Sequence, residues 1–236
     1  MIHNVQIVRH SWPINDGVCQ EVIDLVTDNA TSLSMMQPAK TSPTFKIYQT
    51  ALEVEVANYL CLEPPNRMEL VTADYSGGMI GFALCGLPLN GSSLECEIYY
   101  LAVAKPFRGH KVMSLMVRDI LARYPGVSLC CGLKLVPQYQ GFGFKCVDQI
   151  EQNVVMVRGT RKEDIPVIPP MTFMTHPLVV QERELAQKKF TQRELDRADR
   201  DMSKQLHQAK ENTKRFLKIQ NPTKKTSKVA PVPPIV

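Results

Sequence analysis

The sequence lacks a long uninterrupted apolar run. Its longest apolar stretch, residues 78–89, covers only about twelve residues and contains three glycines and a proline. Because a helix needs about 20 apolar residues to cross a bilayer, we expect no membrane span. No apolar core segment or small-residue cleavage site follows the first twelve residues, so we also expect no signal peptide.

Patterns for metal binding and disulfide bonding are missing as well. The chain has seven cysteines, an odd number, and contains neither a CxxC nor an HExxH spacing. Most of the cysteines lie inside apolar runs, where a free thiol behaves as a small hydrophobic side chain. We therefore expect no metal site, and a reducing, cytoplasmic compartment.

The charge is unevenly distributed along the chain. Residues 1–177 carry 14 Lys and Arg against 16 Asp and Glu, whereas residues 178–236 carry 14 against 7, and together these give the net charge of +5. The sequence therefore indicates a nearly neutral body followed by a basic C-terminal segment.

Hydrophobic periodicity predicts the order β-α-α-β-β-β-α-β-α-β-β over the body. Apolar and polar residues alternate over residues 4–9, as in a half-buried strand, and helical spacing appears over residues 18–26 and 47–62. Residues 31–45 have little periodicity and suggest a loop. The expected fold class is α/β, with a mixed sheet flanked by helices.

The C-terminal quarter has a different character. Residues 159–177 include four prolines and suggest a linker, and residues 178–220 contain neither proline nor glycine, which favours one long charged helix. The Lys- and Pro-rich residues 221–236 should form an extended tail. We therefore divide the chain into a domain of residues 1–158, this linker, this helix and this tail. The sequence leaves open whether the helix packs on its own domain or on another chain.

Three motifs follow one another in the second half of the body. Residues 100–103, Tyr-Leu-Ala-Val, end a predicted strand; residues 107–113, Phe-Arg-Gly-His-Lys-Val-Met, precede an apolar helix; and residues 139–144 read Tyr-Gln-Gly-Phe-Gly-Phe. The free N–H groups and the dipole of a helix N-terminus suit a diphosphate. In this order and spacing the motifs resemble those of the GNAT superfamily of acyl-CoA-dependent N-acyltransferases, over about residues 3–158.

The resemblance implies a GNAT-like, mostly antiparallel sheet and acetyl-CoA as cofactor. In the family, backbone amides at the end of the central strand bond the pantetheine arm, and the following loop holds the pyrophosphate. The residues that the resemblance assigns to CoA binding are Leu101, Ala102, Val103, Arg108, Gly109, His110, Lys111, Val112 and Met113.

The pyrophosphate loop departs from the family pattern [RQ]-x-x-G-x-[GA]. Lys111 stands at the first glycine position and Met113 at the second small position. Glycine lets the backbone approach the diphosphate without a Cβ in the way, whereas lysine adds both bulk and charge. Either CoA binds in a modified way, with Arg108, His110 and Lys111 supplying positive charge, or it does not bind.

The resemblance also suggests catalytic residues. Glu97 lies six residues before Val103, where the histone-acetyltransferase branch keeps its general base, and Tyr139 matches the family's general acid. By strand alternation Glu95 points to the same face as Glu97, so the two carboxylates could raise each other's pKa. In the competing interpretation, Glu95 and Glu97 form a solvent-exposed strand face and Tyr139 is a packing residue.

Two functions are compatible with these patterns. The first is an N-acetyltransferase that moves an acetyl group from acetyl-CoA directly to an amine. The alternative is a catalytically inactive GNAT-like assembly protein, for example a phage virion component, that docks on a larger complex. In either case we expect a protein partner or a second copy to bind residues 178–236. Lys224, Lys225 and Lys228 could add weak contacts to nucleic-acid phosphates.

Overall fold

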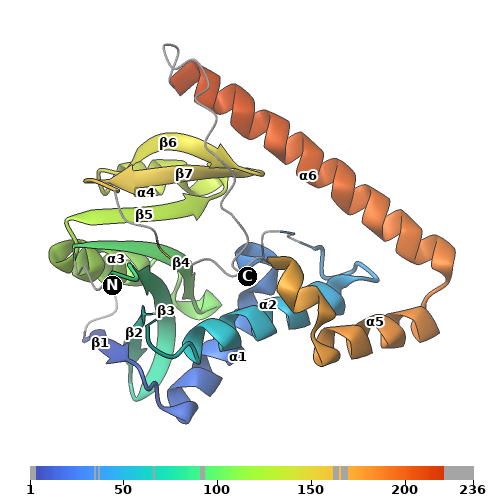
Figure 1. Ribbon diagram of the computed structural model, residues 1–236, viewed down its shortest axis with the longest axis horizontal. Helices are drawn as coiled ribbons and strands as arrows, with labels where there is room; N and C mark the ends of the chain where they lie inside the picture. The colour runs from blue at the N-terminus through green and yellow to red at the C-terminus, as the bar shows by residue number, and fades with distance from the viewer. Residues whose placement is uncertain are drawn as a thin grey trace.

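The computed structural model describes residues 4–34, 36, 38–65, 67–90, 94–161, 165 and 170–220 (Figure 1). The element order predicted for the body is confirmed. The strands are β1 (Gln6–Ser11), β2 (Arg67–Tyr75), β3 (Gly78–Leu87), β4 (Glu95–Val103), β5 (Gly126–Cys131), β6 (Lys145–Ile150) and β7 (Asn153–Arg158). The α-helices are α1 (Asp16–Leu33), α2 (Phe45–Leu60), α3 (Val112–Arg123), α4 (Val136–Gln140), α5 (Pro177–Lys189) and α6 (Gln192–Gln220). Three 3₁₀ turns, η1 (Lys105–Phe107), η2 (Leu133–Leu135) and η3 (Pro170–Thr175), complete the described elements.

The strands form one seven-stranded sheet in the order β1-β2-β3-β4-β5-β7-β6. Every pair is antiparallel except β4 and β5, which run parallel. The β2–β3 hairpin turns through Ser76 and Gly77, whose φ angles of 52° and 82° suit the right-handed twist of the two strands. The mixed, mostly antiparallel sheet flanked by helices is therefore the fold class that the sequence predicted.

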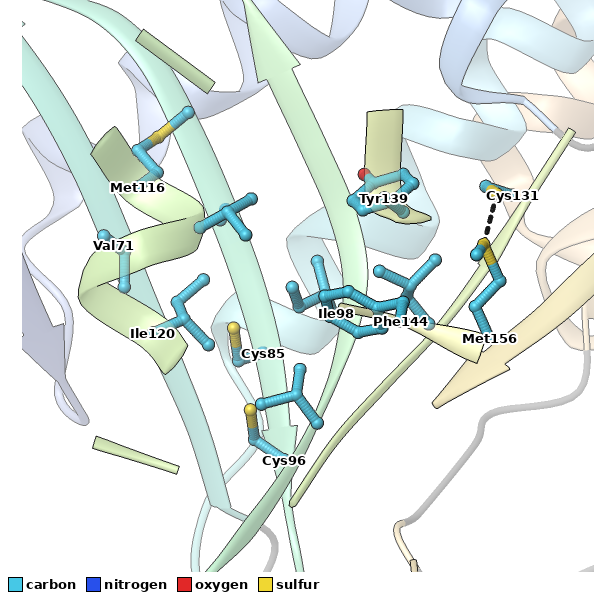
Figure 2. Close-up of a cluster of buried hydrophobic side chains, with 14 of the residues drawn as sticks. Val71, Cys85, Cys96, Ile98, Met116, Ile120, Cys131, Tyr139, Phe144 and Met156 are labelled. Atoms are coloured by element: carbon cyan, nitrogen blue, oxygen red, sulfur yellow. Dashed lines mark hydrogen bonds between the residues drawn. The ribbon is translucent and has the colours of Figure 1, made fainter. Parts of the chain in front are cut away.

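Helices cover both faces of the sheet. On one face, α1 and α2 pack against β2, β3 and β4 through a cluster that includes Val26, Val56 and Phe82. On the other face, α3 and α4 bury a second cluster, which Figure 2 shows, with Ile120 of α3 lying beside Cys85 of β3 and Met116 closer to Gly81. The buried thiols of Cys85 and Cys96 belong to this second core.

Helix α1 is longer than the sequence predicted. The expected loop over residues 31–45 is wrong at its start, because α1 continues to Leu33. Polar residues in the last turns are satisfied within the helix: the Asn29 amide donates to the Leu25 carbonyl at 2.7 Å, and the Thr27 hydroxyl donates to the Ile23 carbonyl at 2.9 Å. Because these residues bond within their own helix, the low apolar content of the segment does not end it.

The single helix predicted over residues 178–220 is also wrong, because the chain breaks between α5 and α6. Phe190 is extended, with φ −121° and ψ 150°. Thr191 and Glu194 then form a capping box: the Thr191 N–H donates to the Glu194 carboxylate at 2.8 Å, and the Glu194 N–H donates to the Thr191 hydroxyl at 3.3 Å. The Thr-x-x-Glu spacing is a helix-start signal that residue composition alone does not reveal.

The C-terminal segment packs on its own body. Phe173 of η3 and Val179 and Ala186 of α5 are buried against Ile47 and Val54 of α2. The predicted linker of residues 159–177 therefore ends in a structured turn, while the predicted tail, with Lys224, Lys225 and Lys228, lies outside the described residues. Among the residues described, no helix combines the length and apolar character needed to cross a membrane.

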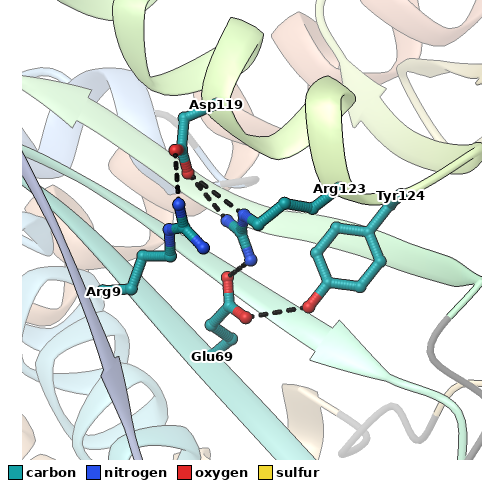
Figure 3. Close-up of polar contacts among 5 residues, drawn as sticks. All are labelled: Arg9, Glu69, Asp119, Arg123 and Tyr124. Atoms are coloured by element: carbon teal, nitrogen blue, oxygen red, sulfur yellow. Dashed lines mark hydrogen bonds and ion pairs between the residues drawn. The ribbon is translucent and has the colours of Figure 1, made fainter.

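A polar network on the α3 side ties three elements together (Figure 3). Glu69 of β2 accepts hydrogen bonds from the Arg123 guanidinium and, at 2.8 Å, from the Tyr124 hydroxyl. Arg123 also pairs with Asp119 one helical turn earlier at 2.9 Å, and Arg9 of β1 reaches Asp119 at 3.3 Å. These bonds fix the C-terminal end of α3 on β1 and β2, and so hold the helix in place.

We predict that Glu69→Gln lowers the free energy of unfolding by about 1–3 kcal/mol, because it removes the charge that both Arg123 and Tyr124 bind. Urea denaturation followed by circular dichroism measures the loss. Glu63→Gln, at an exposed position beyond α2, is the matched control and should change stability by less than about 0.5 kcal/mol. Equal effects of the two substitutions would contradict a structural role for the network.

Candidate functional site

The central opening of the molecule lies where β4 and β5 separate. Their parallel pairing runs from Glu95 and Gly126 to Ile98 and Leu129 and then stops. Beyond that point β4 continues to Val103 alongside β3, whereas β5 continues to Cys131 alongside β7. Two strands that part in the middle of a sheet leave unpaired backbone groups facing the gap.

A β-bulge in β4 accompanies the separation. Leu84 of β3 pairs with Tyr100, and the next residue, Cys85, pairs with Ile98, so Tyr99 is an extra residue in β4. The Tyr99 ring lies over Gly86, where an added Cβ would come within 2.5 Å of the phenol oxygen. Bulges bend a strand and change which face its side chains occupy.

The bulge brings odd- and even-numbered residues of β4 to the same face of the sheet. Before it, Cys96 and Ile98 point into the core under α3, so Glu97 points to the side of α1 and α2. After it, Tyr100 and Ala102 point to the side of α1 and α2. Glu97 and Tyr100 therefore share a face although they are three residues apart.

A cleft of about 490 Å³ opens at the end of β4 and the start of α3. Eight of the nine residues predicted to bind CoA line it, and the exception, His110, does not. Ser32 and Leu33, from the end of α1, form part of its wall, as do Gln138 and Tyr139 of α4. The structure thus gathers the predicted CoA-binding residues around one hollow.

The N-terminus of α3 faces this cleft. Lys111 is the N-cap residue, and the Leu115 N–H makes the first α-helical bond, to the Lys111 carbonyl at 3.0 Å. The N–H groups of Val112, Met113 and Ser114 consequently have no acceptor within the helix, and the helix dipole adds positive potential there. Lys111 has a φ of 67°, in the left-handed region that glycine adopts most readily. Lysine therefore takes up the turn at the position where the family pattern has glycine, at a cost in backbone energy.

Arg108 is already engaged in the protein. Its Nε donates to the Val103 carbonyl at 3.2 Å, and its Nη2 donates to the buried Asn29 side chain of α1. These bonds join the end of β4, the loop and α1. The Arg108 guanidinium therefore holds the loop in place. Lys111 also lines the cleft, and no such hydrogen bond to a described residue engages its side chain.

A second, smaller cavity of about 240 Å³ lies between the separated strands. It shares Leu101, Leu135 and Tyr139 with the cleft, so the two hollows lie next to each other on these side chains. Its lining includes the carboxyl groups of Glu97 and Glu55. Of the three residues predicted to be catalytic, Glu97 and Tyr139 line this cavity and Glu95 does not.

Glu97 is buried, with an exposed fraction of 7%. The interpretation of this strand face as solvent-exposed is wrong, since Glu95 is 6% exposed. Burial raises the pKa of Glu97, and the ion pair with Arg161, at 3.2 Å, opposes part of that rise. The causes of the shift at Glu97 are burial and Arg161, and Glu95 lines neither hollow.

The ring of Tyr139 is packed, and its hydroxyl differs from the ring in its contacts. Its ring meets Phe144 edge-on with centroids 5.7 Å apart, and Figure 2 shows the two side by side. Within the described part of the chain the hydroxyl has no hydrogen-bond partner. Burial raises the pKa of the phenol, so it stays protonated and can donate.

Sequence reasoning did not find two residues at or near the cavity. Arg161, which pairs with Glu97 but is not part of the cavity lining, comes from the segment predicted to be a linker, and Glu55 comes from α2. The Tyr100 hydroxyl hydrogen-bonds the Glu55 carboxylate, and burial raises the pKa of Glu55. No local pattern marks these residues, because the tertiary fold brings them to the cavity. In the ranges described, no cluster of His, Cys, Asp or Glu could hold a metal ion.

Comparison with known proteins identifies the architecture. Residues 33–144 match the family model of the acetyltransferase (GNAT) family. An acyl-CoA N-acyltransferase from Pseudomonas aeruginosa superposes with a TM-score of 0.51 at 13% identity, covering 66% of this chain and all of the other. PaiA N-acetyltransferase of Thermoplasma acidophilum, in complex with coenzyme A, gives 0.49 at 11% identity, covering 66% of this chain and 99% of the other. No curated protein matches the chain.

We predict a pH-dependent effect of Glu97→Gln on stability. A carboxyl group whose pKa is higher in the folded state favours folding below its ordinary value of 4.5, and this contribution is lost as pH rises through the folded-state pKa. The free energy of unfolding of the variant, relative to the wild type, should therefore increase as pH rises above 4.5. Urea denaturation at a series of pH values measures the difference, with Glu63→Gln as the amide-substitution control. A difference that stays constant or falls with pH would contradict the assignment.

Proposed function

We propose that this chain, whose body belongs to the GNAT superfamily, is an N-acyltransferase that moves an acetyl group from acetyl-CoA directly to an amine. The observation that carries the proposal is that the two hollows adjoin at Leu101, Leu135 and Tyr139. One is walled by the end of β4 and the N-terminus of α3, and the other holds Glu97 and Tyr139. A thioester at their junction would lie beside both side chains.

The cleft fits the CoA arm and its diphosphate. Leu101, Ala102 and Val103 offer backbone groups that β5 does not pair, and the free N–H groups of the first turn of α3 suit phosphate oxygens. Lys111 supplies a nearby positive charge. Bound acetyl-CoA would supply the thioester, which is the acyl donor.

Glu97 is suited to accept a proton from the attacking amine. Its raised pKa brings it closer to the working pH, where a general base is most effective. Arg161 holds the carboxylate through the ion pair at 3.2 Å. The amine nitrogen forms the new C–N bond while its proton passes to Glu97.

Tyr139 is suited to protonate the leaving sulfur. As the C–S bond breaks, the free hydroxyl can donate its proton to the thiolate, and the phenol is restored from solvent through the open cleft. The same hydroxyl has no structural partner among the described residues, so its role in the protein would be this donation.

The alternative of an inactive assembly or virion protein gains no support from the comparisons, which match acyltransferases. Contacts of the C-terminal segment with a partner, or of its lysines with nucleic acid, stay predictions.

We predict that titration with CoA gives measurable heat in calorimetry and that Lys111→Met weakens binding roughly fivefold, because an exposed charge pair contributes up to about 1 kcal/mol. Lys105→Met removes the same charge from η1, outside the cleft, and should leave the affinity unchanged. Absence of heat and of any thermal shift at millimolar CoA would overturn the proposed function.

We predict that Glu97→Gln and Tyr139→Phe each lower kcat by about 100-fold or more, the usual contribution of a general base or acid. Release of free thiol from acetyl-CoA in the presence of primary amines follows turnover. Tyr139→Phe keeps the ring that packs on Phe144, so its melting temperature should match the wild type. Full activity in both folded variants would show that other groups move the protons.

A further inference from the structure

Helix α6 runs along one edge of the molecule as a strut, from the end of α5 toward the side of β6 and β7 (Figure 1), and it contacts the body in two places. Near its start, Leu195 is buried in the cluster formed by α2 and α5. Near its other end, Thr213 donates to the Gln152 carbonyl at 2.7 Å, and Lys210 pairs with Glu151 at 2.9 Å. Both of these partners lie in the turn between β6 and β7. The helix therefore spans from α2 to this turn.

Under this strut lies a third hollow, which we call the α6 chamber, of about 510 Å³. Tyr48, Ala51 and Leu52 of α2 form one wall, and Leu206 and His207 of α6 form the opposite one. The walls are largely apolar. Volumes of about 300–1,000 Å³ are typical of sites for small molecules.

The chamber adjoins the cavity that Glu97 lines. The two share Ser34, Glu55 and Tyr100, whereas the cavity and the CoA cleft share Leu101 and Tyr139. The three hollows therefore follow one another from the N-terminus of α3 to α6. A molecule in the chamber would approach Glu97 from the side opposite the CoA cleft, past Glu55 and Tyr100.

Glu55 stands at the junction of chamber and cavity with a hydrogen bond from Tyr100 but, within the described ranges, without a cation. The second carboxylate of the chamber, Glu151, already forms an ion pair with Lys210. A partly buried carboxylate is stabilised by a positively charged partner, and an apolar group attached to that partner can fill the apolar surroundings. An ammonium group attached to an apolar body has this chemistry.

We infer that the acyl acceptor is a small primary amine with an apolar body, which occupies the α6 chamber and places its amine beside Glu55 on the way to Glu97. The inference rests on the proposed function and names its substrate class. Glu55 then acts as a positioning residue for the amine, and α6, which lies outside the family match, sets acceptor specificity.

Calorimetry on the full chain saturated with CoA tests the inference without requiring turnover. Phenethylamine and hexylamine, which carry one amine on an apolar body, should bind. Spermidine, which has several charges and no apolar body, and a short lysine-containing peptide should bind at least about tenfold more weakly. In turnover assays the same order should appear in kcat/KM. Preference for spermidine or for the peptide would overturn the inference.

Two substitutions with matched controls locate the site. Leu206→Trp fills the chamber and should raise the KM for phenethylamine at least about tenfold with the CoA affinity unchanged, whereas Gln205→Trp, on the exposed side of the same helix, should have no effect. Glu55→Gln is isosteric and should raise the same KM about tenfold or more, with kcat changed far less. Glu53→Gln, on α2 but outside the chamber, is its control.

The outcomes separate the inference from the proposed function. If CoA gives no heat, the acyltransferase proposal itself fails. If CoA binds but the apolar amines do not, or if Leu206→Trp and Glu55→Gln leave their binding unchanged, the proposed function stands and the assignment of the α6 chamber is wrong.

Discussion

The separation of β4 from β5 is the constraint on which the whole site depends. A continuous sheet would place paired backbone and packed side chains where the two hollows meet. The pairing of β4 with β5 ends at Ile98 and Leu129, so backbone groups of both strands face the gap. The bulge at Tyr99 then brings both Glu97 and Tyr100 to the side of α1 and α2. Gly86 gives the Tyr99 ring room in its observed position, since a Cβ there would lie 2.5 Å from the phenol oxygen.

The surroundings of the gap hold it in a fixed shape. On one side the Glu69–Arg123–Asp119 network fixes the C-terminal end of α3, and on the other Arg108 joins α1 to the end of β4. The N-terminus of α3 therefore keeps its position relative to Val103. A helix dipole stabilises an anion only over the first turn, so this fixed geometry matters for phosphate binding.

The C-terminal segment changes what the fold can do. A GNAT-like body ends at β7, and here η3 and α5 pack on α2 while α6 crosses to the β6–β7 turn. The added helix supplies Leu206, His207 and Lys210 to the lining of the chamber. The extra length of the chain is in this way linked to the site of the body rather than set apart from it.

The sequence by itself determined the order of elements, the fold class and the set of residues around the CoA cleft, because these depend on local periodicity, on turn residues and on motifs of short span. Only the tertiary structure decided which carboxylates are buried and what meets them. Alternation along the strand places Glu95 and Glu97 on one face, but only the bulge at Tyr99 brings Tyr100 to that face as well. Glu55 reaches the cavity, and Arg161 reaches Glu97, from distant segments. Burial and long-range contacts determine the pKa values and the interaction partners of these side chains, and the spacing of neighbouring residues predicts neither.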